Sequence, residues 1–215
     1  MSSRQTVIIN FQTPDLLRRS VSSFRDVYPD ERLELVDNGS ADGSADVLRE
    51  LASIHPESTG ITIHPRNLYH GPAMHRAILD ADAEHVFVLD SDTVTRRGGF
   101  LEHMSALLDG SDDVYAVGQR VFVDRRGFAA EDGFPVPVSA HMMIRRRMYT
   151  DLPPFEHHGL PVLRNCAAAS DKGWQVAEFP VEQYVDHLGR GTAERFGYGL
   201  GWKSRLDYLL HRLGF

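Results

Sequence analysis

Two aspartates one residue apart, Asp90 and Asp92, follow directly after the apolar run His85 to Leu89. Two carboxylates this close repel each other unless a cation lies between them. Carboxylate oxygens, together with the oxygens of a diphosphate, are ligands that suit Mg²⁺ or Mn²⁺. A solvated turn or a helix cap would use the same residue types, so the pair alone leaves both interpretations open.

In the first half of the chain, strands alternate with helices, and these elements must position the two aspartates. Each strand–helix unit spans roughly 25–30 residues, as in βαβ units, and such crossovers require a mostly parallel sheet. The sequence therefore predicts a Rossmann-like α/β fold, with helices flanking the sheet. The expected strands are 6–11, 33–36, 60–64 and 85–89, and the expected helices are 14–24, 47–51, 72–82 and 100–108.

Polar clusters follow three of these strands, at Phe11–Thr13, Asp37–Ser40 and Asp90–Asp92. The carboxyl ends of parallel strands meet at one edge of the sheet, and ligands of such sheets bind just beyond that edge. We therefore expect the three clusters to lie together and to form the functional site. Thr13 is also expected to cap a helix that begins at Pro14.

The second half of the chain is less regular. Strands are expected at 114–123, 141–144 and 175–179, and 181–185 is also strand-like, while 160–172 is expected to be a helix. The segment 124–137, rich in glycine, proline and charge, is expected to be a loop. Five glycines make 189–201 a flexible segment, and 206–213 predicts a terminal amphipathic helix.

Size and charge narrow the function classes. The 215 residues suit a single domain, and a net charge of -7 without a basic tail argues against a nucleic-acid partner. The single cysteine, Cys166, excludes an internal disulfide and fits a reducing cytoplasm, where we expect the protein. No signal peptide is evident, and no apolar run approaches the ~18–20 residues of a spanning helix. Peripheral membrane contact through the C-terminal helix remains open.

The turn Asp37-Asn38-Gly39-Ser40-Ala41-Asp42-Gly43-Ser44 after a strand, with Asp90-Ser91-Asp92 further along, resembles the GT-A glycosyltransferases of family 2. Members carry a D-[DN]-G-S-x-D-x-[ST] turn and place a D-x-D after their fourth strand. The resemblance covers 6–110 well and is looser over 111–200. It implies a GT-A fold in one glycosyltransferase domain, with a nucleotide-sugar-binding half (1–110), an acceptor-binding half (111–200) and a C-terminal helix (201–215).

The resemblance also implies where the nucleotide binds. In the family the loop after the first strand holds the base, which assigns that role here to Phe11, Gln12 and Thr13. The first aspartate of the turn bonds the base, here Asp37, with Asn38 beside it. An ionised carboxylate accepts a hydrogen bond from uracil, so a UDP-sugar is favoured over a GDP-sugar. An Asx turn is the alternative role for Asp37.

A second segment near the donor is Arg66–Ala73, which lies where family members carry N-x-G-x-x-x-A-x-N. Gly71, expected just before a helix N-terminus, would let the backbone approach the ligand. His70 departs from the commoner pattern and either touches phosphate or sugar or is a loop residue. Asp90 and Ser91 complete the implied nucleotide-sugar-binding set.

Many family members add a late histidine to the metal shell, and the corresponding candidate is His187, expected just after the strand-like 181–185. The resemblance thus implies a Mn²⁺ or Mg²⁺ site of Asp90, Asp92 and His187. Arg190, in the glycine-rich segment that follows, would neutralise the leaving phosphate. A solvated loop charge is its alternative role.

The catalytic base is where the sequence departs from the family. Inverting members carry an E-D pair about a dozen residues before a G-[WY] dipeptide, but counting back from 173–174 reaches Pro161 and Val162. Glu156 is our candidate base, since Phe155 and His157 beside it would partly desolvate it. The missing pair leaves open a retaining reaction, or a chain that binds donor without turnover.

Two other functions compete with this one. A sugar nucleotidyltransferase also uses an α/β sheet, a metal and a nucleotide, but the glycine-rich loop expected after its first strand is missing from Asn10–Pro14. A non-catalytic nucleotide-sugar-binding subunit would account for the absent E-D pair. The acceptor, a saccharide, a lipid-linked group or a protein, is not specified. Arg145–Arg147 is expected to be a solvated strand exit, with an anionic acceptor site as the alternative.

Overall fold

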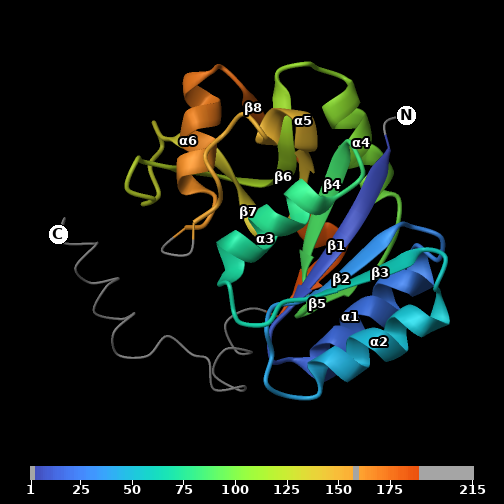
Figure 1. Cartoon of the computed structure of the whole chain (residues 1–215). Coiled ribbons are helices and arrows are strands. Elements are labelled where there is room, and N and C mark those ends of the chain that lie inside the picture. Colours follow the sequence, from blue (N-terminus) through green and yellow to red (C-terminus); the bar gives the residue numbers. More distant parts are fainter. Residues whose placement is uncertain (1–2, 157–159, 189–215) are drawn as a thin grey trace.

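The protein is built on a seven-stranded sheet with the order β3-β2-β1-β4-β7-β6-β8 (Figure 1). The structure, a computed structural model, describes residues 3–156 and 160–188. The strands of this sheet are β1 (Arg4–Asn10), β2 (Leu33–Asp37), β3 (Thr59–Ile63), β4 (His85–Asp90), β6 (Val114–Val123), β7 (Phe134–Arg145) and β8 (Gln175–Glu178).

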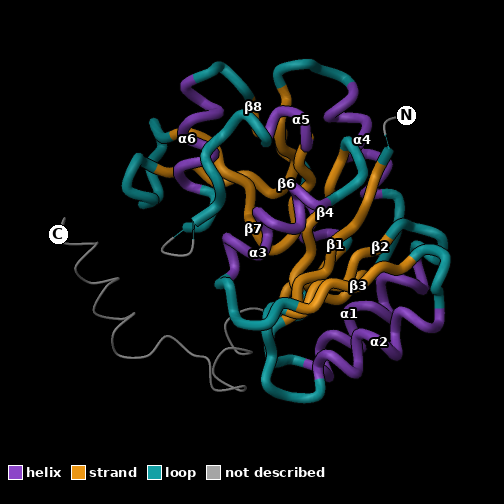
Figure 2. The backbone as a smooth tube through the Cα atoms, viewed as in Figure 1, coloured by secondary structure: helices purple, strands orange, loops and turns teal. Residues whose placement is uncertain are grey.

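Helices cover both faces of this sheet (Figure 2). They are α1 (Pro14–Val27), α2 (Ser44–Ile54), α3 (His70–Asp80), α4 (Phe100–Asp109), α5 (Arg146–Tyr149) and α6 (Leu163–Asp171), with a 3₁₀ helix, η1, at Val181–Gln183. Within the part of the chain that the structure describes, no helix has the length and apolarity needed to cross a membrane.

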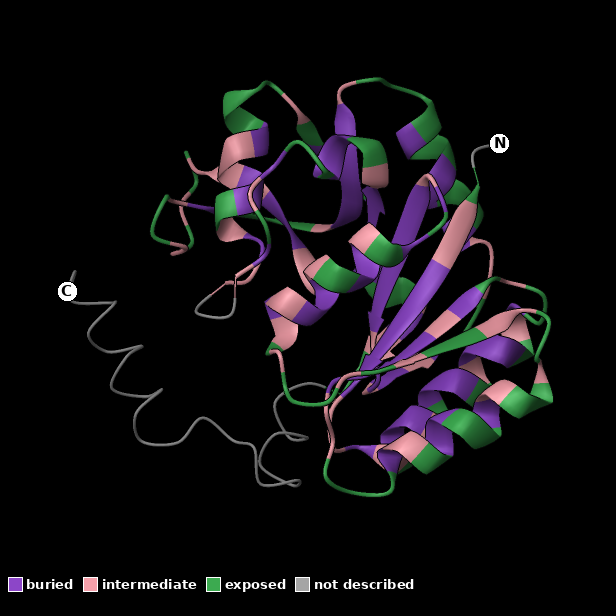
Figure 3. Cartoon of the chain, in the orientation of Figure 1, coloured by how far each residue is buried: buried purple, intermediate pink, exposed green. Residues whose placement is uncertain are grey.

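Alternating side chains of the strands divide the interior into two apolar clusters. Val7 and Ile9 of β1 pack in one cluster with α3 and α6, while Ile8 packs in the other with α1, α2 and α4. Figure 3 shows the buried residues along the sheet and on the helix sides that face it. Burial of both faces explains why the central strands are apolar throughout rather than alternating with polar residues.

The first four strands of the sheet are parallel, as predicted. β1 pairs in parallel with β2 and β4, and β2 with β3, whereas β7 runs antiparallel to both β4 and β6. β8 returns in parallel beside β6. The predicted mostly parallel sheet flanked by helices is therefore confirmed, and its antiparallel part comes from the less regular second half.

Several element boundaries differ from the prediction. The expected loop 124–137 is wrong at its end, because β7 begins at Phe134 and reaches well before the expected strand 141–144. Residues 134–137 pair with β6, whereas β4 meets β7 only from His141 onward. On that stretch β7 has one partner strand, so Pro135 and Pro137, which lack an N–H, can be accommodated.

A second, two-stranded sheet was not predicted. The strand-like 181–185 is instead the 3₁₀ helix η1, and the strand that follows is β9 (Val185–His187). β9 pairs antiparallel with β5 (Thr93–Thr95), which starts immediately after the Asp90–Asp92 triplet. Thr93 lies opposite His187 in this ladder, so the pairing brings the late histidine to the end of β4.

The arginines of Arg145–Arg147 serve the fold rather than extending into solvent together. Arg145 is buried and donates to the carbonyl of Ser111. Arg146 donates to the carbonyl oxygens of Ile78 and Leu79 at the end of α3, which a helix leaves without intrahelical partners. The expectation of a solvated run therefore holds only for Arg147, which is exposed.

Candidate active site

Asp90 is the last residue of β4 and lies at the carboxyl edge of the sheet. Its Oδ1 is enclosed and accepts no hydrogen bond from the described residues, while Nε2 of His70 lies 3.7 Å from it. Burial raises the pKa of Asp90, as does the charge of Asp92, whereas His70 and His187 lower it. A buried carboxylate oxygen without a hydrogen-bond partner is costly, and a bound cation would satisfy it.

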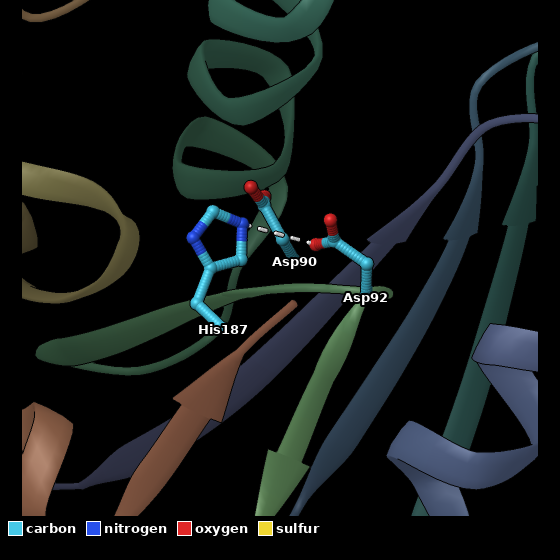
Figure 4. Close-up of side chains that lie close together, drawn as sticks. All are labelled: Asp90, Asp92 and His187. Atoms are coloured by element: carbon cyan, nitrogen blue, oxygen red, sulfur yellow. Dashed lines mark ion pairs between the residues drawn. The ribbon is translucent and has the colours of Figure 1, made fainter. Parts of the chain in front are cut away.

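His187 lies beside the two aspartates (Figure 4). Its Nε2 is 3.2 Å from Oδ1 of Asp92, and this hydrogen bond raises the pKa of His187 against the opposing effect of burial. One ligand atom from each of Asp90, Asp92 and His187 lies within 4.8 Å of the others. Two carboxylates and an imidazole in this arrangement are a donor set that fits a divalent cation such as Mn²⁺.

A buried polar chain connects this cluster to the turn after β2. Ser91 and Thr13 share a hydrogen bond of 3.0 Å between their hydroxyls, and the Thr13 hydroxyl donates to Oδ1 of Asn10 at 2.7 Å. Asn10 in turn donates to Oδ1 of Asp37 at 3.2 Å. The three polar clusters expected at one edge of the sheet therefore meet.

Thr13 precedes α1 as predicted, but its side chain makes no capping bond to the helix. Its hydroxyl instead bonds Asn10 and Ser91 in the polar chain. Gln12, beside it, has a left-handed backbone, with φ of 55°, and its N–H donates to the hydroxyl of Ser40. Phe11 is half-buried in the same loop.

Asp37 is buried, and its carboxylate organises the turn that follows. Oδ1 accepts from the hydroxyl of Ser40 at 2.6 Å and Oδ2 accepts from the Ser40 N–H at 3.0 Å. This is the alternative Asx-type role expected for Asp37. Gly39 within the turn has φ of 76°, and a Cβ there would meet the backbone of Arg66 at 2.1 Å, so the residue must be glycine.

Asn38 ties the turn to the segment that leads into α3. Its Oδ1 accepts from the N–H of Leu68 at 3.0 Å, and its Nδ2 donates to Oδ1 of Asn67 at 3.1 Å and to the carbonyl of Tyr69 at 3.3 Å. His70 opens α3 directly after these contacts. Asn38 therefore helps to set the position from which His70 approaches Asp90.

Gly71 lies within the first turn of α3 rather than before it, and its place in the fold differs from the expected one. A Cβ on Gly71 would meet the backbone oxygen of Glu156 at 1.9 Å. The group that approaches Gly71 closely is therefore the backbone carbonyl of Glu156 and not a ligand. This approach brings Glu156 to the helix turn that carries His70.

Glu156 itself is partly buried and forms an ion pair. Its side chain is 39% exposed, and Oε1 accepts a hydrogen bond of 2.7 Å from Arg164 on α6. Phe155 is buried beside it and turns away into the core with Tyr149. His157 and His158, the other titratable groups of this segment, lie outside the described residues, as do Arg190, the glycine-rich segment and the C-terminal helix.

Sequence reasoning missed two residues that shape the site: Asn10 and His141. A polar residue ending an apolar strand was the available signal for Asn10. His141 is buried on β7 opposite Leu89, and its ring centroid is 6.3 Å from that of His187, with the planes at 90°. Burial lowers the pKa of His141. Nothing in its local sequence indicates that it lies beside a residue so far along the chain.

Comparison with known proteins places this geometry among sugar transferases. A curated relative, undecaprenyl-phosphate 4-deoxy-4-formamido-L-arabinose transferase of Proteus mirabilis (strain HI4320), is 35% identical over 79 residues, which are 37% of this chain and 24% of that protein. The matched region thus covers only 24% of the length of this relative.

Solved structures show the same fold at low identity. A mannosyltransferase from Pyrobaculum calidifontis, in complex with GDP-Man and Mn²⁺, matches with a TM-score of 0.68 and 15% identity over 83% of this chain and 55% of that one. Glucosyl-3-phosphoglycerate synthase from Mycobacterium tuberculosis, in complex with UDP, matches with a TM-score of 0.61 and 15% identity, over 82% and 69% of the chains.

The family model described as "Glycosyl transferase family 2" matches residues 6–164, which run from β1 into α6. The solved structures match more than four fifths of this chain in fold, so the predicted GT-A fold is confirmed. Because the family match takes in well over half of its length, this chain belongs to glycosyl transferase family 2.

Proposed function

We propose that the protein transfers a sugar from a nucleoside diphosphate donor to an acceptor, with a divalent cation held by Asp90, Asp92 and His187. The observation that carries the proposal is the enclosed Oδ1 of Asp90, without a hydrogen-bond partner among the described residues, beside a second carboxylate and an imidazole. Mn²⁺ in the related mannosyltransferase complex supports the same choice of ion.

The cation would neutralise the charge that develops on the leaving diphosphate. The chain's own residues do the rest of the positioning. The polar chain from Ser91 through Thr13 and Asn10 to Asp37 keeps the nucleotide edge of the site rigid. His70, at the start of α3, is placed to contact a phosphate or sugar oxygen next to Asp90.

A UDP-sugar is the donor we favour. Asp37 Oδ2 accepts a single hydrogen bond among the described residues, from Ser40, and a carboxylate oxygen can accept a second. The uracil N–H would supply that second donor. Holding the turn and bonding the base are then two roles of one carboxylate.

For the reaction itself we propose inversion with Glu156 as the base. The acceptor hydroxyl gives its proton to Glu156, its oxygen bonds to the anomeric carbon, and the bond from that carbon to the diphosphate breaks. The approach of the Glu156 backbone to Gly71 supports this assignment, since it joins Glu156 to the helix end that faces Asp90. Arg164, which donates to Oε1 at 2.7 Å, would hold the carboxylate in position.

A thermal-shift panel tests the proposal. UDP- and GDP-sugars are added with Mn²⁺ or with EDTA, because a ligand that binds only the native state raises the melting temperature. The shift should require Mn²⁺ and should be lost in Asp92→Asn, whose fold stays intact. Asp82→Asn, a carboxylate with a side chain 97% exposed, is the matched control and should keep the shift. Donor binding that is unchanged in EDTA would contradict the metal site.

Product analysis then separates the remaining functions. Release of a nucleoside diphosphate with a new glycoside identifies a transferase, whereas pyrophosphate exchange identifies a sugar nucleotidyltransferase. Donor binding without either product indicates a non-catalytic subunit. The division into donor and acceptor halves, the acceptor class, peripheral membrane contact and a cytoplasmic location stay predictions.

A further inference from the structure

The polar chain at the carboxyl edge of the sheet crosses β1 and consists of Asp37, Asn10, Thr13 and Ser91. In the sheet, β1 lies between β2, which ends at Asp37, and β4, which ends at Asp90. Asn10 is the last residue of β1 and pairs with Asp37, while Ser91 directly follows Asp90. The chain therefore connects the turn that we assign to the base with the cluster that we assign to the cation.

The direction of each hydrogen bond in this chain follows from its carboxylate end. A carboxylate has no hydrogen to donate, so Nδ2 of Asn10 must face Asp37, and Oδ1 of Asn10 must face Thr13. The single hydrogen of the Thr13 hydroxyl goes to that Oδ1 at 2.7 Å. The Ser91 hydroxyl must then be the donor in its 3.0 Å contact with Thr13. Every hydrogen in the chain is therefore directed from the end of β4 towards the end of β2.

The surroundings of the chain preserve this direction. All four side chains are buried, so bulk water does not compete for their donors and acceptors. Asp37 also accepts from the N–H and the hydroxyl of Ser40, so a reversed chain would place a hydrogen where two donors already point. Thr13 makes no capping bond to α1, so the helix does not compete for its hydroxyl.

Aligned hydrogen bonds of this kind form a polarised path. Ser91, whose hydrogen is directed away along the chain, stands between Asp90 and Asp92 of the candidate cation site. The other end of the chain delivers a hydrogen to the Asp37 carboxylate. A positive charge at the first end favours this alignment, and in a low-dielectric interior each polarised bond strengthens the next. Asp37 would therefore be held more firmly whenever the cation is bound.

We propose that Thr13 is a positioning residue that couples cation binding to nucleobase binding. Its hydroxyl is the link that both accepts from Ser91 and donates to Asn10, so without it the two ends of the chain are separated. The inference rests on the proposed function, since it needs the cation and the base to bind where we assign them. Such coupling is reciprocal, so the base must strengthen cation binding by the same factor.

Uridine and Mn²⁺ test the coupling, because a nucleoside has no phosphate that could contact the cation. Thr13→Val removes the hydroxyl and keeps the shape, while Thr13→Ser keeps the hydroxyl. Ser91→Ala breaks the neighbouring link and gives the same test if Thr13→Val fails to fold. Thr95→Val is the matched control, because Thr95 is buried and its hydroxyl has no hydrogen-bond partner among the described residues.

Calorimetric titration gives the dissociation constant of uridine with and without Mn²⁺, and electron paramagnetic resonance gives that of Mn²⁺ with and without uridine. In the parent each ligand should lower the dissociation constant of the other about fivefold or more. The ratio should fall to about one in Thr13→Val and Ser91→Ala, and Thr13→Ser and Thr95→Val should keep it. Because each ratio is measured within one protein, a general loss of stability does not imitate a loss of coupling.

A parental ratio in Thr13→Val, or in Ser91→Ala if Thr13→Val fails to fold, would overturn this inference and leave the proposed function standing. A parent protein whose uridine affinity does not respond to Mn²⁺ would do the same. If uridine binds in neither condition while UDP-glucose binds with Mn²⁺, the base is not held at Asp37, and the inference fails while cation-dependent donor binding remains. UDP-glucose binding that is unchanged in EDTA would overturn the proposed cation site and the inference with it.

Discussion

At the scale of single residues, the polar side chains at the edge of the sheet carry structural and chemical roles together. Asp37 holds the Asp37–Ser40 turn through both carboxylate oxygens, and it also accepts from Asn10. Asn10 is buried and Ser40 is half-buried, so their donor groups would be left without this acceptor if the carboxylate were removed. A change at Asp37 should therefore alter both folding and donor binding.

For Asp37→Ala we expect the free energy of unfolding to fall by about 1–3 kcal/mol, the cost of leaving buried donors unsatisfied. UDP affinity should fall as well. Urea denaturation gives the first quantity and titration with UDP and Mn²⁺ gives the second. Asp42→Ala, an exposed residue of the same turn sequence, is the comparison. UDP binding equal to that of the parent would exclude a contact between Asp37 and the base.

Glu156→Gln tests the proposed base at the same scale. The amide keeps the shape of the side chain but cannot take a proton from the acceptor, so kcat should fall roughly 100-fold or more while donor affinity is retained. Single-turnover assays with the acceptor identified from product analysis provide the measurement. Glu131→Gln, in the exposed loop before β7, is the control. A mutant that works at the parental rate would place the base elsewhere.

At the scale of elements, the first half of the fold was predictable because its signals are local. Strands buried on both faces appear as continuous apolar runs, and each helix appears as apolar residues at helical spacing. β5 and β9 gave no such signal, since three residues each are too few to show a pattern and their pairing joins distant parts of the chain. The metal-site candidate His187 was named through a family resemblance, while the ladder that positions it was missed.

The C-terminal end of α3 depends on an arginine from α5. Arg146 donates two hydrogen bonds to carbonyl oxygens in the last turn of α3, where a positive charge is also favoured by the helix dipole. Arg146→Met should lower the free energy of unfolding by about 1–3 kcal/mol. Arg147→Met removes an exposed side chain with ion pairs to Glu84 and Asp112, and should cost less than about 1 kcal/mol. Equal costs in denaturant melts would refute the capping role.

At the scale of the whole molecule, His85 links stability to pH. It is buried at the start of β4, and burial lowers its pKa. Asp109 opposes this effect, while Arg145, Arg4 and Arg147 add to it. In the unfolded chain a histidine titrates near 6.5. The unfolded state therefore binds more protons between the two pKa values, and stability present above about pH 6.5 is lost as the pH falls through the folded pKa.

Replacing His85 with glutamine should flatten this part of the pH profile. Urea denaturation between pH 5 and pH 8 measures the slope, which reports the difference in bound protons between the folded and unfolded states. His103→Gln, at an exposed position on α4, should leave the slope unchanged. A parental slope in His85→Gln would mean that other groups govern the acid side of the profile.

The β5–β9 ladder also has a consequence for how the protein is made. Asp92 and His187 are 95 residues apart (187 − 92), so a ribosome that adds about 5–20 residues per second needs roughly 5–20 seconds to pass from one to the other. During that interval the proposed metal site has Asp90 and Asp92 but not His187. The imidazole arrives when β9 is synthesised and docks on β5, so the proposed site would be completed only after most of the described fold has been synthesised.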